Sequence, residues 1–298
     1  MDWLDCIRWL SYLYICLEGY ILLETQLTRS PMSTPLYDSH IHLADSALAS
    51  YRNQIAVDYK TIGFKQAVVV GTSPEDWPQV LELCKGDPRL IPAIGLHPWK
   101  VNDAPADWQQ QLLHALDQGA LAIGEIGLDK WIKDHDIDRQ QAAFRWQLAQ
   151  ATERNLSVSI HCLKAIGPLM DTLRSQPLPQ RGFHLHAYNG PIELIPELVQ
   201  LGCFFSFNAG QLKAGQTKVH NRIRAVPDER LLIETDAPDM LPTAELRTFE
   251  LNDTESDKRL THPATLIDGY SVIVKIRACS LEFLAKQVAK NFETYFLN

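Results

Sequence analysis

The sequence lacks closely spaced cysteines, because its six cysteines are scattered and form no Cys-x-x-Cys pair. Scattered thiols are typical of reduced core residues, and they predict a cytoplasmic protein without disulfide bonds. Positive charge is also scarce, since 28 Lys and Arg residues face 36 Asp and Glu residues and give a formal net charge of −8. This balance argues against a broad basic face that grips a nucleic-acid backbone, but it does not exclude a small positive pocket.

No apolar run is long enough to cross a membrane. Residues 3–23 are rich in Trp, Tyr, Leu and Ile, but their longest uncharged stretch, residues 9–17, is only nine residues long. A spanning helix needs about 20 apolar residues, and a signal peptide needs a basic start that is missing here. Residues 1–31 are therefore either an amphipathic helix on another surface or an extension absent from the mature chain. We favour the second interpretation, with a single domain over residues 32–298 that begins at Met32.

A regular alternation of short and long segments follows Met32. Eight short apolar runs, each bounded by Gly, Pro or Asp, are typical of buried strands, and stretches with helical spacing such as 138–155 and 191–201 separate them. Strand–helix alternation implies a parallel sheet, and eight such units predict an α/β protein with a (β/α)8 TIM barrel. The alternative α/β fold, a doubly wound open sheet, lacks support, because no G-x-G-x-x-G motif follows any strand and that motif forms the phosphate-binding turn that usually marks this fold. The predicted strands are residues 36–42, 65–71, 90–96, 120–126, 156–162, 182–187, 202–207 and 231–236. Residues 239–262 have no clear period and predict an irregular loop.

Side chains of the types that bind metals follow several of these strands. Alternation along a strand places His40 and His42 on one face, so both imidazoles can reach one ion. The carboxyl ends of barrel strands all face one mouth, where active sites form. A single histidine there is more often structural, but six such residues in register predict a metal site. The six are His40, His42, Glu125, His161, His186 and Asp236.

Other polar residues near these strand ends are weaker candidates. His97 could donate a hydrogen bond to a substrate oxygen, or it could be a structural residue beside Pro98. His184 could support a ligand from behind or replace His186 as a ligand, and we favour His186. Asp129 could equally cap a helix or a loop. Tyr188 and Asn189 could line the substrate pocket, or they could be turn residues before a glycine.

The order and spacing of six motifs resemble the TatD family of metal-dependent hydrolases, part of the amidohydrolase-like group of barrels. The resemblance covers residues 36–298. Each motif is common alone, but their order and spacing together are specific. The motifs are DSHIHL (38–43), GLHPW (95–99), GEIGLD (124–129), IHC (160–162), HAYNG (186–190) and ETDAP (234–238).

The resemblance implies two adjoining metal positions that share a carboxylate. The ligands would be His40, His42, Glu125 and Asp236 for one ion, and Glu125, His161 and His186 for the other. Paired ions can acidify a water and clamp a phosphoryl oxygen, while Asp236 takes the proton, so Glu125 and Asp236 are the expected catalytic residues. This donor set suits one or two ions of Mg²⁺, Mn²⁺ or Zn²⁺. Two divalent ions would leave the pocket net positive and able to attract a phosphate.

One position departs from the family pattern. Leu163 stands where relatives commonly carry a basic residue, and Lys164 could replace it only as a point charge. The resemblance implies a deoxyribonuclease that removes nucleotides from the 3′ ends of single-stranded DNA or RNA, without an obligate protein partner. Two alternatives stay open. The same centre could hydrolyse an ester or amide, such as a D-aminoacyl-tRNA or a small molecule, or the barrel could keep its metal without catalysis.

Overall fold

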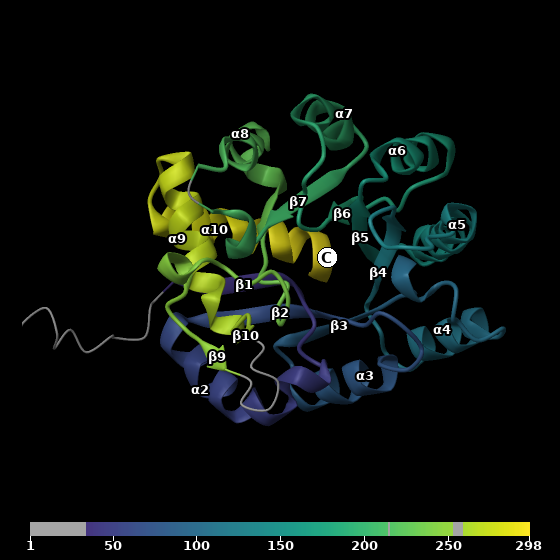
Figure 1. The fold of residues 1–298 in the computed structure, drawn as a ribbon, viewed down its shortest axis with the longest axis horizontal. Coiled ribbons are helices and arrows are strands. Elements are labelled where there is room, and N and C mark those ends of the chain that lie inside the picture. Colours follow the sequence, from purple (N-terminus) through teal and green to yellow (C-terminus); the bar gives the residue numbers. More distant parts are fainter. Residues whose placement is uncertain (1–33, 214, 253–258) are drawn as a thin grey trace, which may run out of the picture. The chain divides into compact units, whose positions relative to one another are not determined.

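Eight parallel strands form one sheet in the order β1 to β8, so each strand pairs with its neighbour in the sequence (Figure 1). The computed structural model describes residues 34–213, 215–252 and 259–298. The strands are β1 (Leu36–Ile41), β2 (Phe64–Val70), β3 (Leu90–Ile94), β4 (Ala122–Asp129), β5 (Ser157–Leu163), β6 (Phe183–Leu185), β7 (Cys203–Phe207) and β8 (Leu231–Ile233). The predicted α/β barrel is confirmed.

Backbone bonds just beyond β8 close the barrel against β1. The Asp236 amide donates to the His40 carbonyl oxygen at 3.0 Å, and the His42 amide donates to the Ala237 carbonyl oxygen at 2.9 Å. The buried carboxylate of Asp38 adds to this seam, because it accepts the backbone amide of Thr235 at 3.0 Å and its hydroxyl at 2.6 Å. The barrel therefore closes at the same residues that the sequence singles out as metal ligands.

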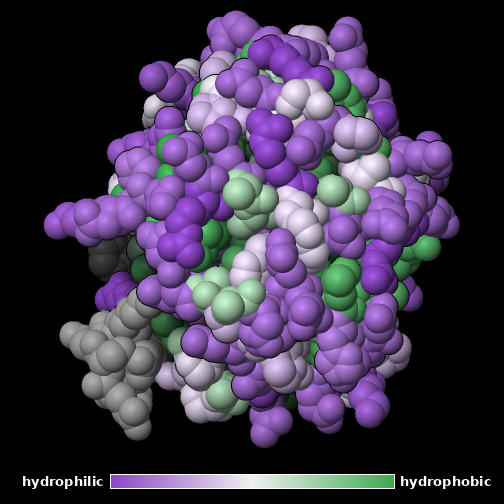
Figure 2. Space-filling model, turned by 90° about the vertical axis from the view of Figure 1, so that its right-hand side faces the viewer, coloured by the Kyte–Doolittle hydropathy of each residue, from purple (hydrophilic) through white to green (hydrophobic). Residues whose placement is uncertain are grey.

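Helices surround the strands, and the face that lies on the right of Figure 1 is mostly hydrophilic, with apolar residues scattered over it (Figure 2). The predicted helix over residues 138–155 is observed as Ile137–Arg154, because Asp136 caps its start and Asn155 ends it in the left-handed conformation. The helices are α2 (Arg52–Ile62), α3 (Trp77–Gly86), α4 (Trp108–Asp117), α5 (Ile137–Arg154), α6 (Ile166–Ser175), α7 (Ile195–Gln200), α8 (Thr217–Ala225), α9 (Leu266–Arg277) and α10 (Leu281–Phe292).

Three expectations about element bounds need correction. The helix expected over residues 191–201 is an α-helix only over Ile195–Gln200, because Pro196 lacks an amide hydrogen and fits only the first turn. Strand β4 continues to Asp129, so Glu125 lies within the strand rather than at its end. The expected irregular loop over residues 239–262 contains a short antiparallel pair, β9 (Leu251–Asn252) with β10 (Arg259–Leu260). Strands of two residues are too short to show a period.

Two buried tyrosines fasten the C-terminal segments to the strands. The Tyr270 hydroxyl, on α9, donates to the Tyr37 carbonyl oxygen and accepts the Tyr37 amide, both at 3.1 Å. The Tyr295 hydroxyl likewise donates to the Val158 carbonyl oxygen of β5 at 2.7 Å and accepts the Val158 amide at 2.8 Å. Each phenol thus satisfies both polar groups of one buried strand residue.

Residues 34–298 form one compact unit. The cysteines that the structure describes, Cys84, Cys162, Cys203 and Cys279, are free thiols, but only Cys84 and Cys203 are the buried core residues that the sequence predicts. Within the described ranges, no helix is both long and apolar enough to cross a membrane. The expectations about residues 1–31, including the start at Met32 and the state of Cys6 and Cys16, lie outside the described residues.

Candidate metal centre

Four donor atoms meet at the seam between β1 and β8. His40 Nε2 and His42 Nε2 lie 3.3 Å apart, and Glu125 Oε2 lies 3.4 Å from the first and 3.3 Å from the second. Asp236 Oδ1 lies 3.6 Å from His40 Nε2 and 3.5 Å from His42 Nε2. Four ligands placed tetrahedrally around a metal, with bonds of about 2.1 Å, are about 3.4 Å from one another. The spacing of His40 Nε2, His42 Nε2 and Glu125 Oε2 therefore fits a single ion, and Asp236 Oδ1 lies close to both imidazoles.

The other oxygen of Glu125 faces a second group of imidazoles. Oε1 lies 2.9 Å from His161 Nδ1 and 2.8 Å from His186 Nε2, and these two nitrogens are 3.3 Å apart. Glu125 is 3% exposed, so neither oxygen is hydrated by bulk solvent. Burial would raise the pKa of Glu125, but the surrounding histidines hold it well below its usual range. An ionised carboxylate between two sets of nitrogens is suited to bridging two cations.

His97 also approaches Oε1 of Glu125, at 3.3 Å, but in a different role. Its Nδ1 accepts the Trp99 amide at 3.2 Å, and burial lowers its pKa to about 4, so the ring is neutral near pH 7. A neutral imidazole that accepts at Nδ1 carries its proton on Nε2. His97 therefore presents a hydrogen-bond donor to the centre rather than a metal ligand.

The first pair of histidines is oriented by groups behind the rings. His42 Nδ1 lies 3.1 Å from the Val70 carbonyl oxygen, which accepts only and therefore fixes the proton on Nδ1. His40 Nδ1 lies 2.8 Å from the Ser159 hydroxyl. Burial would lower the pKa of His42, but Asp236 and Glu125 outweigh it and raise the pKa. The field that favours a proton here also favours a metal cation.

Asp129 orients the imidazole ring of His161 from behind. Its Oδ2 lies 2.9 Å from His161 Nε2, and the side chain is buried. Its Oδ1 accepts the Trp131 amide at 2.6 Å, while the side chain of Gln140 bonds both backbone polar groups of Asp129. Burial would raise the pKa of Asp129, but the hydrogen bonds from His161, the Trp131 amide and Trp99 lower it to about 2. The residue is thus an ionised support for His161, and no helix begins at it.

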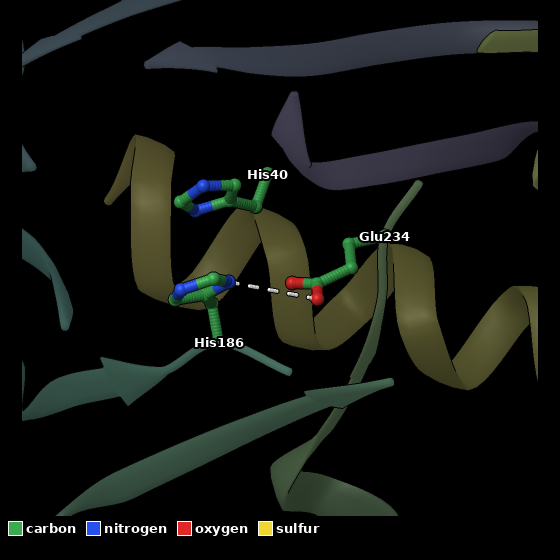
Figure 3. Close-up of side chains that lie close together, drawn as sticks. All are labelled: His40, His186 and Glu234. Atoms are coloured by element: carbon green, nitrogen blue, oxygen red, sulfur yellow. Dashed lines mark ion pairs between the residues drawn. The ribbon is translucent and has the colours of Figure 1, made fainter. Parts of the chain in front are cut away.

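Glu234 is a functional candidate that the sequence analysis missed. The His40 and His186 rings are stacked, with centroids 4.1 Å apart, and the Glu234 carboxylate points toward His186 (Figure 3). Its Oε1 lies 3.7 Å from His186 Nδ1 and accepts the Ala187 amide at 2.9 Å. Burial would raise its pKa, but His186 and the neighbouring imidazoles lower it to about 2. Glu234 stands two residues before Asp236, and that spacing was the signal available in the sequence.

His184 lies beneath this centre rather than in it. Its Nε2 lies 2.6 Å from the Ser206 hydroxyl and its Nδ1 lies 3.4 Å from the Ser159 hydroxyl. With both ring nitrogens engaged and no exposed surface, it offers no free donor to an ion. The alternative that His184 replaces His186 therefore has no geometric support.

The centre opens into a cavity of about 640 Å³ that includes His42, His97, Glu125, His161, His186 and Asp236 among its lining residues. Lys164, Tyr188 and Asn189 instead line a neighbouring cavity of about 340 Å³, and Leu163 and His186 line both. The Tyr188 hydroxyl donates to the Pro191 carbonyl oxygen at 2.7 Å, and only 3% of this residue is exposed. Of the residues expected to bind substrate, His97 faces the metal centre and the other three lie beside it.

A barrel with a buried carboxylate between two groups of histidines defines the class of metal-dependent barrel hydrolases. The model of the TatD-related DNase family matches residues 37–297, and the chain belongs to this family. The metal-dependent hydrolase YabD of Bacillus subtilis is 28% identical over 70% of this chain and 82% of its own length. The 3′-5′ ssDNA/RNA exonuclease TatD of Dickeya dadantii is 27% identical over 88% of this chain and 97% of its own.

Solved structures agree with this assignment. The TatD homologue YjjV of Escherichia coli superposes with a TM-score of 0.79 at 25% identity, and the match covers 88% of this chain and 97% of that one. A TatD family hydrolase from Entamoeba histolytica superposes with a TM-score of 0.75 at 20% identity, over 90% and 100% of the two chains. The second match supports the fold alone.

Proposed function

We propose that this protein is a nuclease of the TatD type that shortens single-stranded DNA or RNA from the 3′ end. The observation that carries the proposal is Glu125, whose two oxygens each face a separate group of donors. One ion would be held by His40, His42, Glu125 and Asp236, and the other by Glu125, His161 and His186. Bound divalent ions supply an acidified water and a positive clamp for phosphoryl oxygens. The exonuclease named among the relatives supports the choice of substrate.

The residues around the ions have separate tasks in this proposal. Asp236, which lines the cavity, accepts the proton of the attacking water. His97 donates from Nε2 toward the reacting centre, where it can stabilise charge on a phosphoryl oxygen. Asp129 keeps His161 in the orientation that ligation needs, and the negative charge of Glu234, 3.7 Å from His186 Nδ1, favours a cation at His186.

Leu163 favours a second candidate function. It lies on the wall between the two cavities, where a basic residue would have bound a phosphate, and Lys164 lines only the smaller cavity. An apolar wall without that basic residue suits the neutral carbonyl group of an ester or amide, such as a D-aminoacyl-tRNA or a small amide, better than it suits a phosphodiester. Activated water attacks a carbonyl carbon by the same chemistry.

A digestion series separates the two functions. Oligonucleotides of DNA and RNA labelled at the 5′ end are incubated with Mg²⁺, Mn²⁺ or Zn²⁺, and with EDTA. We expect a ladder that shortens from the 3′ end with metal, intact substrate with EDTA, and no ladder from a folded Asp236→Asn variant. The exposed Asp103→Asn variant is the matched control and should behave as wild type. Intact oligonucleotides together with hydrolysis of D-aminoacyl-tRNA would replace the first function by the second, and full activity of Asp236→Asn would refute the role of Asp236.

A further inference from the structure

Two exposed tryptophans stand at the rim of the metal-centre cavity. Trp99 is 46% exposed, Trp131 is 58% exposed, and both line this cavity. Within the described ranges, the other strongly exposed aromatic ring is Phe283 of α10, which is not among the residues lining this cavity. Burying a tryptophan is strongly favourable, so two open indole rings at one cavity call for a ligand that covers them.

The carboxylate that supports His161 bonds the side chain of Trp99 and the backbone of Trp131. The indole Nε1 of Trp99 donates to Asp129 Oδ2 at 2.7 Å, and the backbone amide of Trp131 donates to Asp129 Oδ1 at 2.6 Å. The Trp99 ring also packs edge-on against His97, with centroids 5.2 Å apart. The Trp99 ring and the backbone that carries Trp131 are thus fixed beside the candidate centre before any substrate arrives, which lowers the entropy cost of binding there.

The spacing of the two rings decides how a ligand can use them. Their centroids are 6.4 Å apart and their planes are inclined by 31°. A flat ring held between two others needs about 7 Å, that is, two contacts of about 3.5 Å. The tryptophans are too close for such a slot, and they form one tilted aromatic face instead. Lys100, next to Trp99 in the chain and exposed on the same cavity, adds positive charge at its edge.

We infer that the Trp99–Trp131 face binds a nucleobase of the substrate strand while the adjoining phosphodiester lies at the metal centre. This inference rests on the proposed nuclease function and specifies its substrate as a strand that carries a base next to the bond being cut. Every base has a π-face, so stacking selects unpaired nucleotides without selecting a sequence. Stacking on an aromatic side chain typically strengthens binding about 5- to 100-fold per base. Stacking on this face also supplies affinity for the strand, which the net negative charge of the protein does not favour.

The test compares strands with and without a base. Trp131→Ala removes a ring whose backbone amide, not its side chain, bonds Asp129, so the support of His161 remains. We measure kcat/KM on a single-stranded oligonucleotide and on the same strand with abasic sites at its 3′ end. The preference for the strand that carries bases is expected to fall about 5- to 100-fold in Trp131→Ala. Trp131→Phe, which retains a ring, and Phe283→Ala, on α10, should keep most of the preference.

An unchanged preference in Trp131→Ala, or an equal loss on both strands, would overturn the inference. A second measurement separates it from the proposed function. Calorimetric titrations compare binding of AMP with binding of ribose 5-phosphate, which has the same phosphate but no base. If the wild type cuts no oligonucleotide, the nuclease proposal fails, yet tighter binding of AMP that disappears in Trp131→Ala still supports an aromatic platform. Equal binding of the two ligands by the wild type would overturn it.

Discussion

Asp129 is the residue on which two features of the site converge. One oxygen bonds both His161 and the Trp99 indole, and the other accepts the Trp131 amide. A buried carboxylate with this many donors is ionised, and its negative charge makes the imidazole of His161 a stronger ligand. In the proposed function, ligation by His161 and the placement of the Trp99 ring would therefore both depend on this one side chain.

Replacing Asp129 by Asn tests this dependence. The amide keeps the shape but loses the charge, so we expect the metal concentration for half-maximal activity to rise about 10- to 100-fold. A titration of activity with metal measures it. The exposed Asp134→Asn variant, in the same connection between β4 and α5, is the control and should titrate as wild type. Identical titrations for Asp129→Asn and the control would contradict the assigned role.

For His97 we expect the reverse result, a loss of catalytic rate without a loss of metal affinity. The Nε2 atom of His97 donates a hydrogen bond and offers no lone pair to an ion. We therefore expect His97→Phe to lower kcat while the protein still binds its metal. Loss of one donor to a developing charge typically costs about 100-fold in rate. Activity assays and the metal content after dialysis measure the two quantities. A variant that loses metal together with activity would show that His97 is a ligand after all.

The sequence predicted the six candidate ligands because strand alternation and barrel topology bring strand ends together whatever the details of packing. It did not reveal the supports behind them. Asp38 and Glu234 stand two residues from a candidate ligand and could have been found by alternation. Asp129 could not be separated from a cap, because its partner His161 is 32 residues away in the chain and is known only from the fold.

Secondary-structure elements were predicted well where a local signal sets their ends and less well where tertiary contacts do. Asp136 and Asn155 are local signals, and α5 begins and ends beside them. By contrast, β4 continues past Glu125 to Asp129 because it pairs with β5 over that length, with Gly127 opposite His161. Gly127 has φ of 144°, and a Cβ there would lie 2.0 Å from the His161 carbonyl oxygen, so only glycine fits.

The tyrosines that fasten α9 and the C-terminal segment provide a prediction about elements. Tyr270→Phe leaves the buried amide and carbonyl of Tyr37 without their partner, so we expect a loss of about 1–3 kcal/mol in the free energy of unfolding. Tyr59→Phe is the matched control, since the Tyr59 hydroxyl is buried and has no hydrogen-bond partner among the described residues. Urea denaturation measures both. Equal stability of the two variants would show that the bonds to Tyr37 contribute nothing.

At the scale of the whole molecule, a net charge of −8 coexists with a centre built for cations. Four of the predicted ligands come from β1, from β4 and from the segment after β8, and β4 is not a neighbour of the other two in the sheet. An ion bound by these four would tie together parts of the barrel that are distant in the sequence. Metal binds the folded state and not the unfolded one, and it therefore stabilises the fold by mass action.

Thermal unfolding with and without metal tests this coupling. At a metal concentration about 100 times Kd the gain is about 2.7 kcal/mol, which corresponds to a rise of about 5 °C in the Tm of a domain of this size. Asp236→Asn should lose most of the rise, whereas Asp103→Asn should retain it. A Tm that is the same in EDTA and in metal would exclude a metal that contributes to the fold.

The seam between β1 and the residues after β8 has a consequence for how this protein can change over time. His40, His42 and Asp236 provide both the backbone bonds that close the barrel and the side chains that meet at the centre. The closure bonds are made by backbone atoms, so replacing one of these side chains changes the centre and leaves the bonds of the seam in place. The barrel can therefore stay closed while the chemistry at its mouth changes, both at the candidate ligands and at the cavity wall.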